Sequence, residues 1–473
     1  MRHSRQESTN HEDTVRLPGH ACHPPTLHRV SMASVMRMIL GYDAMALARR
    51  ERLPVAWDSE RMLNPHMLIV GKSGAGKTHL LRNMTSQLLA ASAGRLRIHI
   101  LDVHGDIDID GSSTVKFSES TSYGFNPLTI NADPDFGGVR KRVQSLIAAL
   151  GRTGYRLGLK QEAVLRNLLY DLYAANGFRD GDPASWALRD PAHPDRAKHN
   201  PTLDDAVRFS QAKLRAMFLG TSARTVEALE KLYRKQASFQ RLVRQGARAR
   251  PEEREALQKT LHETTESCVA LFREHLEHME HGHELDDLLK YDSREVMKGV
   301  VERLENLRSI GIFRPQRPPF DRANAVWRYD IKALLRDEQK LFVSFILEAI
   351  LNARMQQGMQ NDVRELVVLD EAHLFVDEDA DNPVNIIARE GRKFGLGLFA
   401  ASQSPNHFSE DFLSNVASKV ILGIDQMYWD TLVRRFKVDP KALEWIVLQK
   451  RVIMQLAGLR ETRTPFQYVD LNG

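Results

Sequence analysis

The sequence predicts an α/β protein in which a parallel sheet is interrupted by a large helical insertion. Residues 66–103 have the pattern of a strand, a loop, a helix and a second strand, which is a βαβ unit. Residues 366–369 are a short continuous apolar run, typical of a strand inside a parallel sheet, and a long apolar helix is predicted before them over 337–358. Between these two parts, over 131–324, apolar residues recur mainly at helical spacing.

This prediction divides the chain into segments of different character. Residues 1–28 are polar without periodicity, which is typical of a mobile tail, whereas the apolar stretch Met32–Ala48 favours a short amphipathic helix. The expected segments are an N-terminal tail with this lead-in helix (1–54), the first half of the core (55–130), the mainly helical insertion (131–324), and the second half of the core with C-terminal strands (325–473).

Local patterns predict the individual elements. Apolar residues three or four apart predict insertion helices around 164–173, 229–243 and 257–276, and Thr202 with Asp205 forms a capping box that opens another helix. Short apolar runs predict the strands, because a strand inside a parallel sheet is buried on both faces. The expected strands are 66–70, 95–103, 366–369, 396–401, 419–423, 451–456 and, as a closing strand, 462–469.

Composition sets limits on the class of protein. The 66 basic and 61 acidic residues leave a net charge of +5, which is compatible with a polyanionic partner but does not require one. Cys22 and Cys268 are the only cysteines, so a disulfide framework is excluded and a reducing, cytoplasmic compartment is expected. No apolar run reaches the roughly 18 residues that a membrane span needs, so we expect no transmembrane segment.

The segment Gly71–Thr78 has the complete Walker A pattern G-x-x-x-x-G-K-T between a predicted strand and a predicted helix. Its glycines allow the backbone N–H groups to surround phosphates, Lys77 would reach the terminal phosphates, and the Thr78 hydroxyl would bind Mg²⁺. We therefore expect binding of ATP with Mg²⁺. The predicted nucleotide-binding residues are Gly71, Ser73, Gly74, Gly76, Lys77, Thr78 and His79.

A second motif at the end of the predicted strand 366–369 completes this chemistry. Asp370 and Glu371 follow the strand directly. Asp370 can hold Mg²⁺ and Glu371 can polarise the attacking water. Burying two acidic side chains at a strand end without a cation would cost free energy. This cost favours the catalytic interpretation.

Three further groups are candidates. Gln403 follows the strand 396–401, where it could bind the terminal phosphate or the lytic water. Arg392, accompanied by Arg389 and Lys393, could act on the phosphate of a neighbouring subunit, although plain surface charge would explain these cations too. The turn Asp102–Asp106 could face the ligand or be an ordinary strand-to-loop turn, and the residues alone leave both open.

The insertion contains a basic run. Residues 224–254 include nine basic and four acidic residues. A solvated helical hairpin is the more common explanation of such a run, and contact with nucleic acid is the alternative.

The set of motifs G-K-S-G-A-G-K-T, D-V-H-G-D, L-D-E-A-H, E-G-R-K-F-G and A-S-Q-S-P, in this order, resembles the HerA and FtsK branch of P-loop ATPases, in particular HerA-like helicase domains and the ATPases of type IV secretion and conjugation. The resemblance covers about residues 55–130 and 325–460. It implies a RecA-like core and a ring, usually a hexamer, that pumps DNA or drives macromolecular transfer. The D-E-A-H letters do not indicate a DEAH-box helicase, because no Q-x-x-G-R-x-G-R stretch follows.

Carried onto this chain, the resemblance implies phosphate and magnesium contacts by Lys77 and Thr78, metal-holding and catalytic carboxylates at Asp370 and Glu371, a polar sensor at Gln403, and a trans-acting arginine at Arg392. The leading hypothesis is a Mg²⁺-dependent, ring-forming DNA translocase in DNA transfer, processing or defence. The alternatives are an ATPase that powers protein secretion or remodels a protein partner without DNA, and a nucleotide-gated scaffold that hardly hydrolyses ATP.

Overall fold

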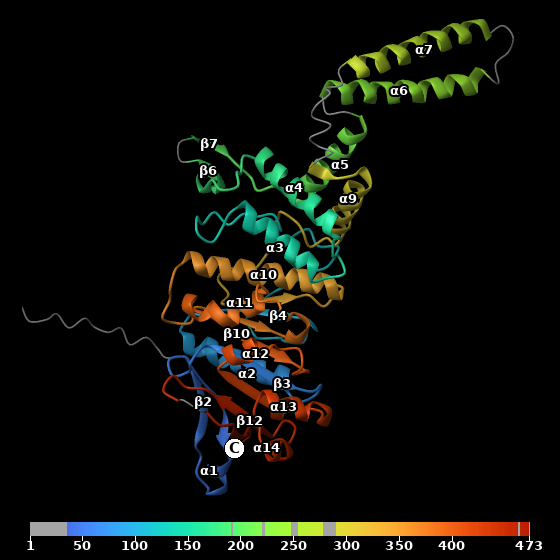
Figure 1. The fold of residues 1–473 in the computed structure, drawn as a ribbon. Helices are drawn as coiled ribbons and strands as arrows, with labels where there is room; N and C mark the ends of the chain where they lie inside the picture. Colours follow the sequence, from blue (N-terminus) through green and yellow to red (C-terminus); the bar gives the residue numbers. More distant parts are fainter. Residues whose placement is uncertain are drawn as a thin grey trace, which may run out of the picture. The chain divides into compact units, whose positions relative to one another are not determined.

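An 11-stranded sheet organises the computed structural model (Figure 1). The strand order is β2-β1-β13-β12-β11-β3-β10-β9-β4-β8-β5. The strands are β1 (Arg37–Asp43), β2 (Pro54–Asp58), β3 (His66–Gly71), β4 (Arg97–Asp102), β5 (Ser113–Lys116), β8 (Val326–Asp330), β9 (Glu365–Leu369), β10 (Leu396–Ser402), β11 (Ser418–Gly423), β12 (Arg451–Leu456) and β13 (Gln467–Asp470).

The structure describes residues 36–190, 193–219, 223–246, 254–277, 290–461 and 464–472, all within the unit Val35–Gly473. The predicted polar tail, Cys22, and the positions Arg248 and Arg250 of the basic run lie outside these residues. No described helix has both the length and the apolar character that crossing a membrane would require.

The strands from β11 to β5 run parallel, as predicted for the core. β3 and β10 are buried along their whole length, because helices cover both faces of the sheet. The predicted strands 66–70, 95–103 and 366–369 are confirmed as β3, β4 and β9 to within two residues at each end.

The other strands extend the sheet in antiparallel fashion, and here one prediction is wrong. Within the stretch Met32–Ala48, where we expected a helix, Arg37–Asp43 forms the strand β1 and only Ala44–Ala48 forms the helix α1. β1 pairs with β2 and with β13 near the other end of the chain, and its residues Met38 and Leu40 are buried. This pairing is invisible to a local pattern, and it overrides the helical spacing of the apolar residues.

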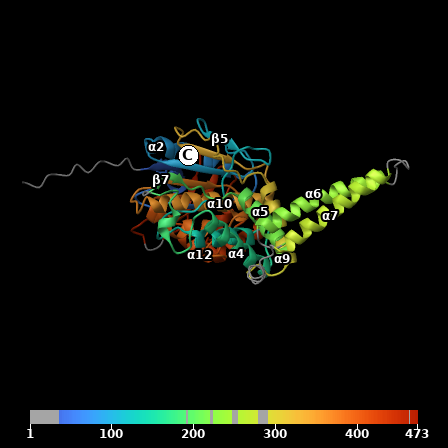
Figure 2. The same cartoon turned by 90° about the horizontal axis from the view of Figure 1, so that it is seen from above.

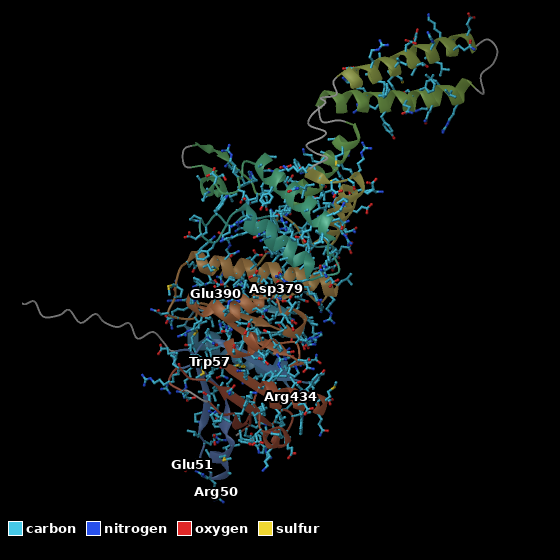
Figure 3. All side chains as sticks on the ribbon, in the orientation of Figure 1. Arg50, Glu51, Trp57, Asp379, Glu390 and Arg434 are labelled. Atoms are coloured by element: carbon cyan, nitrogen blue, oxygen red, sulfur yellow. The ribbon has the colours of Figure 1, made fainter. Side chains whose placement is uncertain are left out.

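Two layers of helices cover the sheet. On one face, α2 (Lys77–Ser92) packs with residues of β1 and β2, including Trp57, which Figure 3 labels. On the other face, the helix predicted over 337–358 is confirmed as α10 (Arg336–Gln356). Further helices of the second half are α11 (Pro383–Glu390), α12 (Glu410–Asn415), α13 (Trp429–Arg435) and α14 (Pro440–Trp445).

The insertion leaves the sheet after β5 and returns at β8. Its helices are α3 (Val139–Gly151), α4 (Leu159–Ala175), α5 (Leu203–Leu219), α6 (Ala223–Gly246), α7 (Arg254–Glu277) and α9 (Arg294–Ser309), with a short hairpin of β6 (Arg189–Asp190) and β7 (His193–Ala197). α3, α4, α5 and α9 pack on one another, while α6 and α7 lie side by side (Figures 1 and 2). The capping box of Thr202 and Asp205 is confirmed, with the Asp205 N–H donating to Thr202 Oγ1 at 3.2 Å.

Ion pairs join the insertion to the core. Arg142 of α3 lies 3.0 Å from Glu348 of α10. Arg152, just after α3, lies 2.7 Å from Asp379, which Figure 3 labels beside the second half of the core. These pairs fix the base of the insertion against α10 and the segment that follows β9.

Candidate active site

The residues predicted to bind and hydrolyse a nucleotide meet at one edge of the sheet. β3, β10, β9 and β4 are parallel neighbours, so their carboxyl ends lie side by side. The Walker A loop follows β3, Gln403 follows β10, Asp370 and Glu371 follow β9, and the turn Asp102–Asp106 follows β4. The structure therefore assigns this turn, which the sequence left open, to the same site.

The Walker A loop has the backbone conformation that glycine permits. Gly74 and Gly76 have φ values of +76° and +95°, which residues with a Cβ rarely adopt. Space at Gly71 is tight, because a Cβ there would lie 3.1 Å from Leu422 Cβ and 3.2 Å from Ala75 Cβ. The loop leads directly into α2, whose N-terminus has no side-chain cap, so its first N–H groups are available to an anion.

The side chain of Lys77 is buried inside the loop. Its Nζ donates to the carbonyl of Gly71 at 3.0 Å and approaches that of Lys72 at 3.5 Å. These carbonyls hold the ammonium group inside the loop that would surround the phosphates. Of the other predicted nucleotide contacts, Ser73 is exposed in the loop and His79 is exposed in the first turn of α2.

Oxygen atoms suited to a divalent cation gather beside this loop. The carboxylates of Asp102, Asp106 and Asp370 offer oxygen atoms that all lie within 4.8 Å of one another. Thr78 Oγ1 lies 3.3 Å from Asp106 Oδ2. A hydroxyl and carboxylates are the ligands that Mg²⁺ prefers, so the donor set fits this ion. Asp106 was not predicted as a ligand.

Asp102 has a structural role within this group. Its carboxylate accepts the N–H groups of Gly105 at 2.7 Å and Ile107 at 2.9 Å. It also forms a buried ion pair with Arg328 of β8 at 2.8 Å. Because these donors occupy Asp102, the oxygens left to face a cation are those of Thr78 and Asp106, together with Asp370, which follows β9.

Nitrogen atoms from three strand ends surround the Glu371 carboxylate. Gln403 Nε2 donates to its Oε1, and His104 Nε2 lies 3.4 Å from the same oxygen. His373 Nδ1 lies 3.2 Å from Oε2. Burial alone would raise the pKa of Glu371, but the neighbouring side chains of His373 and Gln403 and the charge of Lys77 lower it to about 2. The carboxylate is therefore ionised at neutral pH.

The backbone of Glu371 is itself unusual, with a φ of +47°. A glutamate in the left-handed region is strained, and such strain persists where the surroundings fix the residue. The turn into the short 3₁₀ helix Ala372–Leu374 imposes this conformation on Glu371. Since Gln403 also donates to the side chain, the carboxylate is oriented before any ligand arrives.

Asp370 is in a different electrostatic state. Burial raises its pKa most, and the neighbouring charge of Glu371 adds to this, so that the pKa reaches about 7. A cation placed against Asp370 would remove this effect, because it favours the ionised form. The two adjacent acids are thus pushed apart in pKa, which is typical of catalytic carboxylate pairs.

Hydrogen bonds define the proton position on His373. The Ser402 hydroxyl donates to the carbonyl of Ser404 at 2.8 Å, so it has no hydrogen left for His373 Nδ1, 3.3 Å away. The hydrogen between them therefore belongs to Nδ1. This N–H is therefore donated to Ser402 Oγ, and Oε2 of Glu371, 3.2 Å from the same nitrogen, has no hydrogen-bond partner among the described residues.

The predicted trans-acting arginine lies elsewhere. Arg392 is exposed in the 3₁₀ helix Gly391–Phe394, immediately before β10, and hence at the amino edge of the sheet. One strand separates this edge from the Walker A loop, roughly 20 Å. Lys393 is exposed beside it, and Arg389 lies 3.1 Å from Glu390, which Figure 3 labels. Arg392 therefore cannot reach the nucleotide site of its own chain.

Sequence reasoning missed several members of the site, namely His104, Asp106, Arg328 and His373. His104 and Asp106 lie in the motif D-V-H-G-D, and His373 lies in D-E-A-H. Their position within these motifs could have indicated that they belong to the site. Arg328 stands in no motif, and only the pairing of β4 with β8 brings it to Asp102.

Part of the chain is similar in sequence to known proteins. A family profile described as the central domain of the helicase HerA matches residues 46–133. The "DNA double-strand break repair helicase HerA" of Sulfurisphaera tokodaii is 36% identical over 101 residues, 20% of this chain and 20% of that protein. The protein of the same name from Pyrococcus furiosus is 27% identical over 212 residues, 36% of each chain. The matched parts cover well under half of these relatives' own length.

The solved structure of VirB4 of Thermoanaerobacter pseudethanolicus is similar to this chain with a TM-score of 0.58 and 13% identity. The match covers 92% of this chain and 95% of that chain. At this identity the likeness establishes the fold. The predicted fold class is therefore confirmed: a RecA-like P-loop core with a mainly parallel sheet and a large helical insertion.

Proposed function

The chain belongs to the HerA/FtsK superfamily of P-loop ATPases, and we propose that it is a Mg²⁺-dependent ATP hydrolase that works as a ring-forming DNA translocase. One observation carries the proposal: the Walker A loop lies at the same sheet edge as a buried, ionised Glu371. Glu371 accepts a hydrogen bond from Gln403, and nitrogen atoms of two histidines lie 3.4 Å and 3.2 Å from its oxygens. This arrangement has a phosphate-binding loop, a cation site and a base in one place.

Each residue has a role in the proposed reaction. Lys77 and the N–H groups at the start of α2 bind the phosphates, and Thr78 with Asp370 holds Mg²⁺. When bound, Mg²⁺ neutralises the negative charge that develops on the phosphate oxygens. The ionised Glu371 accepts a hydrogen bond from the attacking water, and Gln403 keeps this carboxylate in place.

The ring is proposed because Arg392, the candidate trans-acting arginine, cannot reach the site of its own chain. Arg392 lies at the opposite edge of the sheet from its own Walker A loop, so its proposed contact with a phosphate requires a neighbouring subunit. A closed ring of identical subunits, which we propose to be a hexamer, places the amino edge of one core beside the loop of the next.

DNA is proposed as the partner on the basis of the relatives' names and of charge. The matched curated proteins are described as DNA double-strand break repair helicases. On α6 of this chain, the side chains of Lys235, Arg241 and Arg244 are exposed. Cations on one helix supply the sequence-independent attraction to phosphates that a translocase needs. We further propose that the protein acts in DNA transfer, processing or defence, and that it works with protein partners of such a system. The proposed location is a reducing, cytoplasmic compartment.

Steady-state ATP hydrolysis tests the proposal. We expect the purified chain to hydrolyse ATP faster with linear duplex or single-stranded DNA, with a stimulation that falls steeply as salt rises. The Glu371→Gln variant, which keeps the shape of the side chain, serves as the matched control and should lose nearly all basal and stimulated hydrolysis. Hydrolysis that DNA leaves unchanged would contradict the DNA part of the proposal, and absence of hydrolysis in the parent would contradict all of it.

A second candidate is an ATPase that acts on a protein partner. The helix pair α6 and α7 exposes large apolar side chains, with Tyr233 exposed to 75% and Val269 to 48%. Exposed apolar side chains favour contact with another protein over contact with DNA phosphates. This candidate would be favoured if DNA left ATP hydrolysis unchanged while a cellular protein fraction increased it. Cross-linking through position 233 would then identify the protein partner in that fraction.

A further inference from the structure

A tight turn near the C-terminus contacts the Walker A loop. The turn Val447–Lys450 leads into β12 and is closed by hydrogen bonds from the N–H of Lys450 to the carbonyl of Val447 at 3.0 Å, and between Val447 and Arg451. Gln449, the third residue of the turn, has a φ of +61°. Glycine or asparagine is usual at such a position, because a longer side chain is strained there.

The turn lies close to the loop on two sides. Leu448 packs so tightly against Gly423 that a Cβ on this glycine would lie 2.5 Å from Leu448 Cδ2. The carbonyl of Gly423 accepts the N–H of Lys72 in the Walker A loop at 2.8 Å. Gly423 therefore connects the turn with the beginning of the loop.

Gln449 makes the direct contact. Its Nε2 donates to the carbonyl of Gly74 at 2.9 Å, across 375 residues of sequence. Its Cγ lies 3.6 Å from the position that a Cβ on Gly76 would occupy. The same peptide unit is fixed at its other end, because the N–H of Ala75 donates to the carbonyl of Lys72 at 3.1 Å.

This contact matters because the loop is otherwise easy to deform. Gly74 and Gly76 adopt positive φ values, and glycine leaves such conformations at little cost. A loop that samples other conformations would present its N–H groups to phosphate for only part of the time, which lowers the apparent affinity. A hydrogen bond that anchors the Gly74 carbonyl removes part of this freedom.

We infer that Gln449 is a positioning residue that pre-forms the Walker A loop for the nucleotide, an inference that rests on the proposed nucleotide binding. Gln449 contacts the loop from outside and acts on the phosphates through Gly74. A left-handed glutamine in a turn is otherwise a poor choice for stability, and its strain fits selection for the amide contact.

Replacement of Gln449 by glycine tests the inference. Glycine suits the turn, so Gln449→Gly removes the amide without damaging the backbone conformation. We expect the dissociation constant for Mg²⁺-ADP, measured by calorimetry on the full chain, to rise about two- to tenfold, as for loss of one hydrogen bond. The KM for ATP should rise similarly while kcat stays within a factor of about two. The melting temperature without nucleotide should not fall.

Lys437 supplies a matched control. It is also a left-handed residue that is not glycine, with a φ of +60°, and its side chain is exposed. Lys437→Gly should leave the affinity for Mg²⁺-ADP unchanged.

The outcomes separate this inference from the proposed function. A parent chain that binds no Mg²⁺-ADP overturns nucleotide binding itself, and with it the inference. A parent that binds while Gln449→Gly binds equally well overturns the inference alone. A weaker affinity that comes with a lower melting temperature would also overturn it, because the turn would then have a purely structural role.

Discussion

His373 Nδ1 lies 3.2 Å from Oε2 of Glu371, while it donates its hydrogen to Ser402 Oγ at 3.3 Å. The other oxygen of Glu371 accepts a hydrogen bond from Gln403 and lies 3.4 Å from His104. The carboxylate thus has nitrogen atoms from the ends of β4, β9 and β10 around it, and Gln403 orients it before any ligand binds. A base that is oriented in advance loses little entropy when the reaction takes place.

Loss of the Glu371 charge should separate binding from hydrolysis. In Glu371→Gln, the side chain keeps its size but no longer attracts the proton of the attacking water. We expect kcat for ATP to fall by about 10² to 10⁴, while Mg²⁺-ADP still binds with nearly the parent affinity. Calorimetry and phosphate release measure the two quantities. Residual hydrolysis above a tenth of the parent rate would show that another residue is the base.

Removal of the His373 ring should slow hydrolysis without weakening binding. His373→Ala removes the side chain that lies 3.2 Å from Oε2 of Glu371 and lowers the pKa of this carboxyl. We expect kcat to fall roughly tenfold, about the effect of one interaction with a charged group, with little change in KM. His407→Ala is the control for loss of a neighbouring histidine, because the centroid of its ring lies 5.7 Å from that of His373. Equal losses in both variants would contradict the assigned role.

The buried Asp370 should make stability depend on pH. Burial and the charge of Glu371 raise its pKa from 3.8 to about 7, so the folded state favours the neutral carboxyl. The stabilisation that the neutral Asp370 carboxyl gives the folded state is fully present below about pH 4. It is lost as pH rises through about 7. In EDTA, Asp370→Asn should therefore be more stable than the parent at pH 8, by up to about 4 kcal/mol.

The advantage of Asp370→Asn should shrink as the pH falls towards 4, and thermal or denaturant unfolding across this range measures it. Saturating Mg²⁺-ADP should reverse the order at pH 8, because the cation stabilises the ionised Asp370 and only the parent offers this carboxylate. A stability difference that does not depend on pH would rule out the elevated pKa.

Mixing of inactive variants should reveal the proposed action of Arg392 between subunits. Arg392→Ala and Lys77→Ala are each expected to lose hydrolysis by about 10³-fold. A mixed ring contains sites that take Lys77 from one subunit and Arg392 from its neighbour, so activity should partly return. Lys393→Ala, a control at the adjacent exposed cation, should remain active. If mixing restores nothing while rings still form, Arg392 has no role between subunits.

Charge reversal on α6 should weaken the response to DNA. In the double variant Arg241→Glu, Arg244→Glu, we expect a lower affinity for DNA and a salt slope that is smaller by about two, while hydrolysis without DNA is unchanged. Lys259→Glu, at an exposed position of α7, is the matched control. A response to DNA that is the same in all three proteins would exclude α6 as the contact.

The residues of this site that lie within short sequence motifs could be predicted from the sequence. The Walker A glycines, Lys77 and Thr78, and the pair Asp370 and Glu371 each follow an apolar strand, and parallel strands bring their carboxyl ends together. Contacts between distant residues could not be predicted in this way. The bond from Gln449 to Gly74, and the strand pairing that places β1 beside β13, depend on how remote segments meet in the folded chain.

The attachment of the insertion has a consequence for the evolution of the protein. Its helices leave after β5 and return at β8, and these two strands are the outermost pair at one end of the sheet, whereas the Walker A strand and the acidic strand lie in its interior. A segment that departs and re-enters at the margin can lengthen, shorten or be exchanged without shifting the register of the interior strands. An insertion at this margin can therefore change in length without disturbing the residues of the candidate active site.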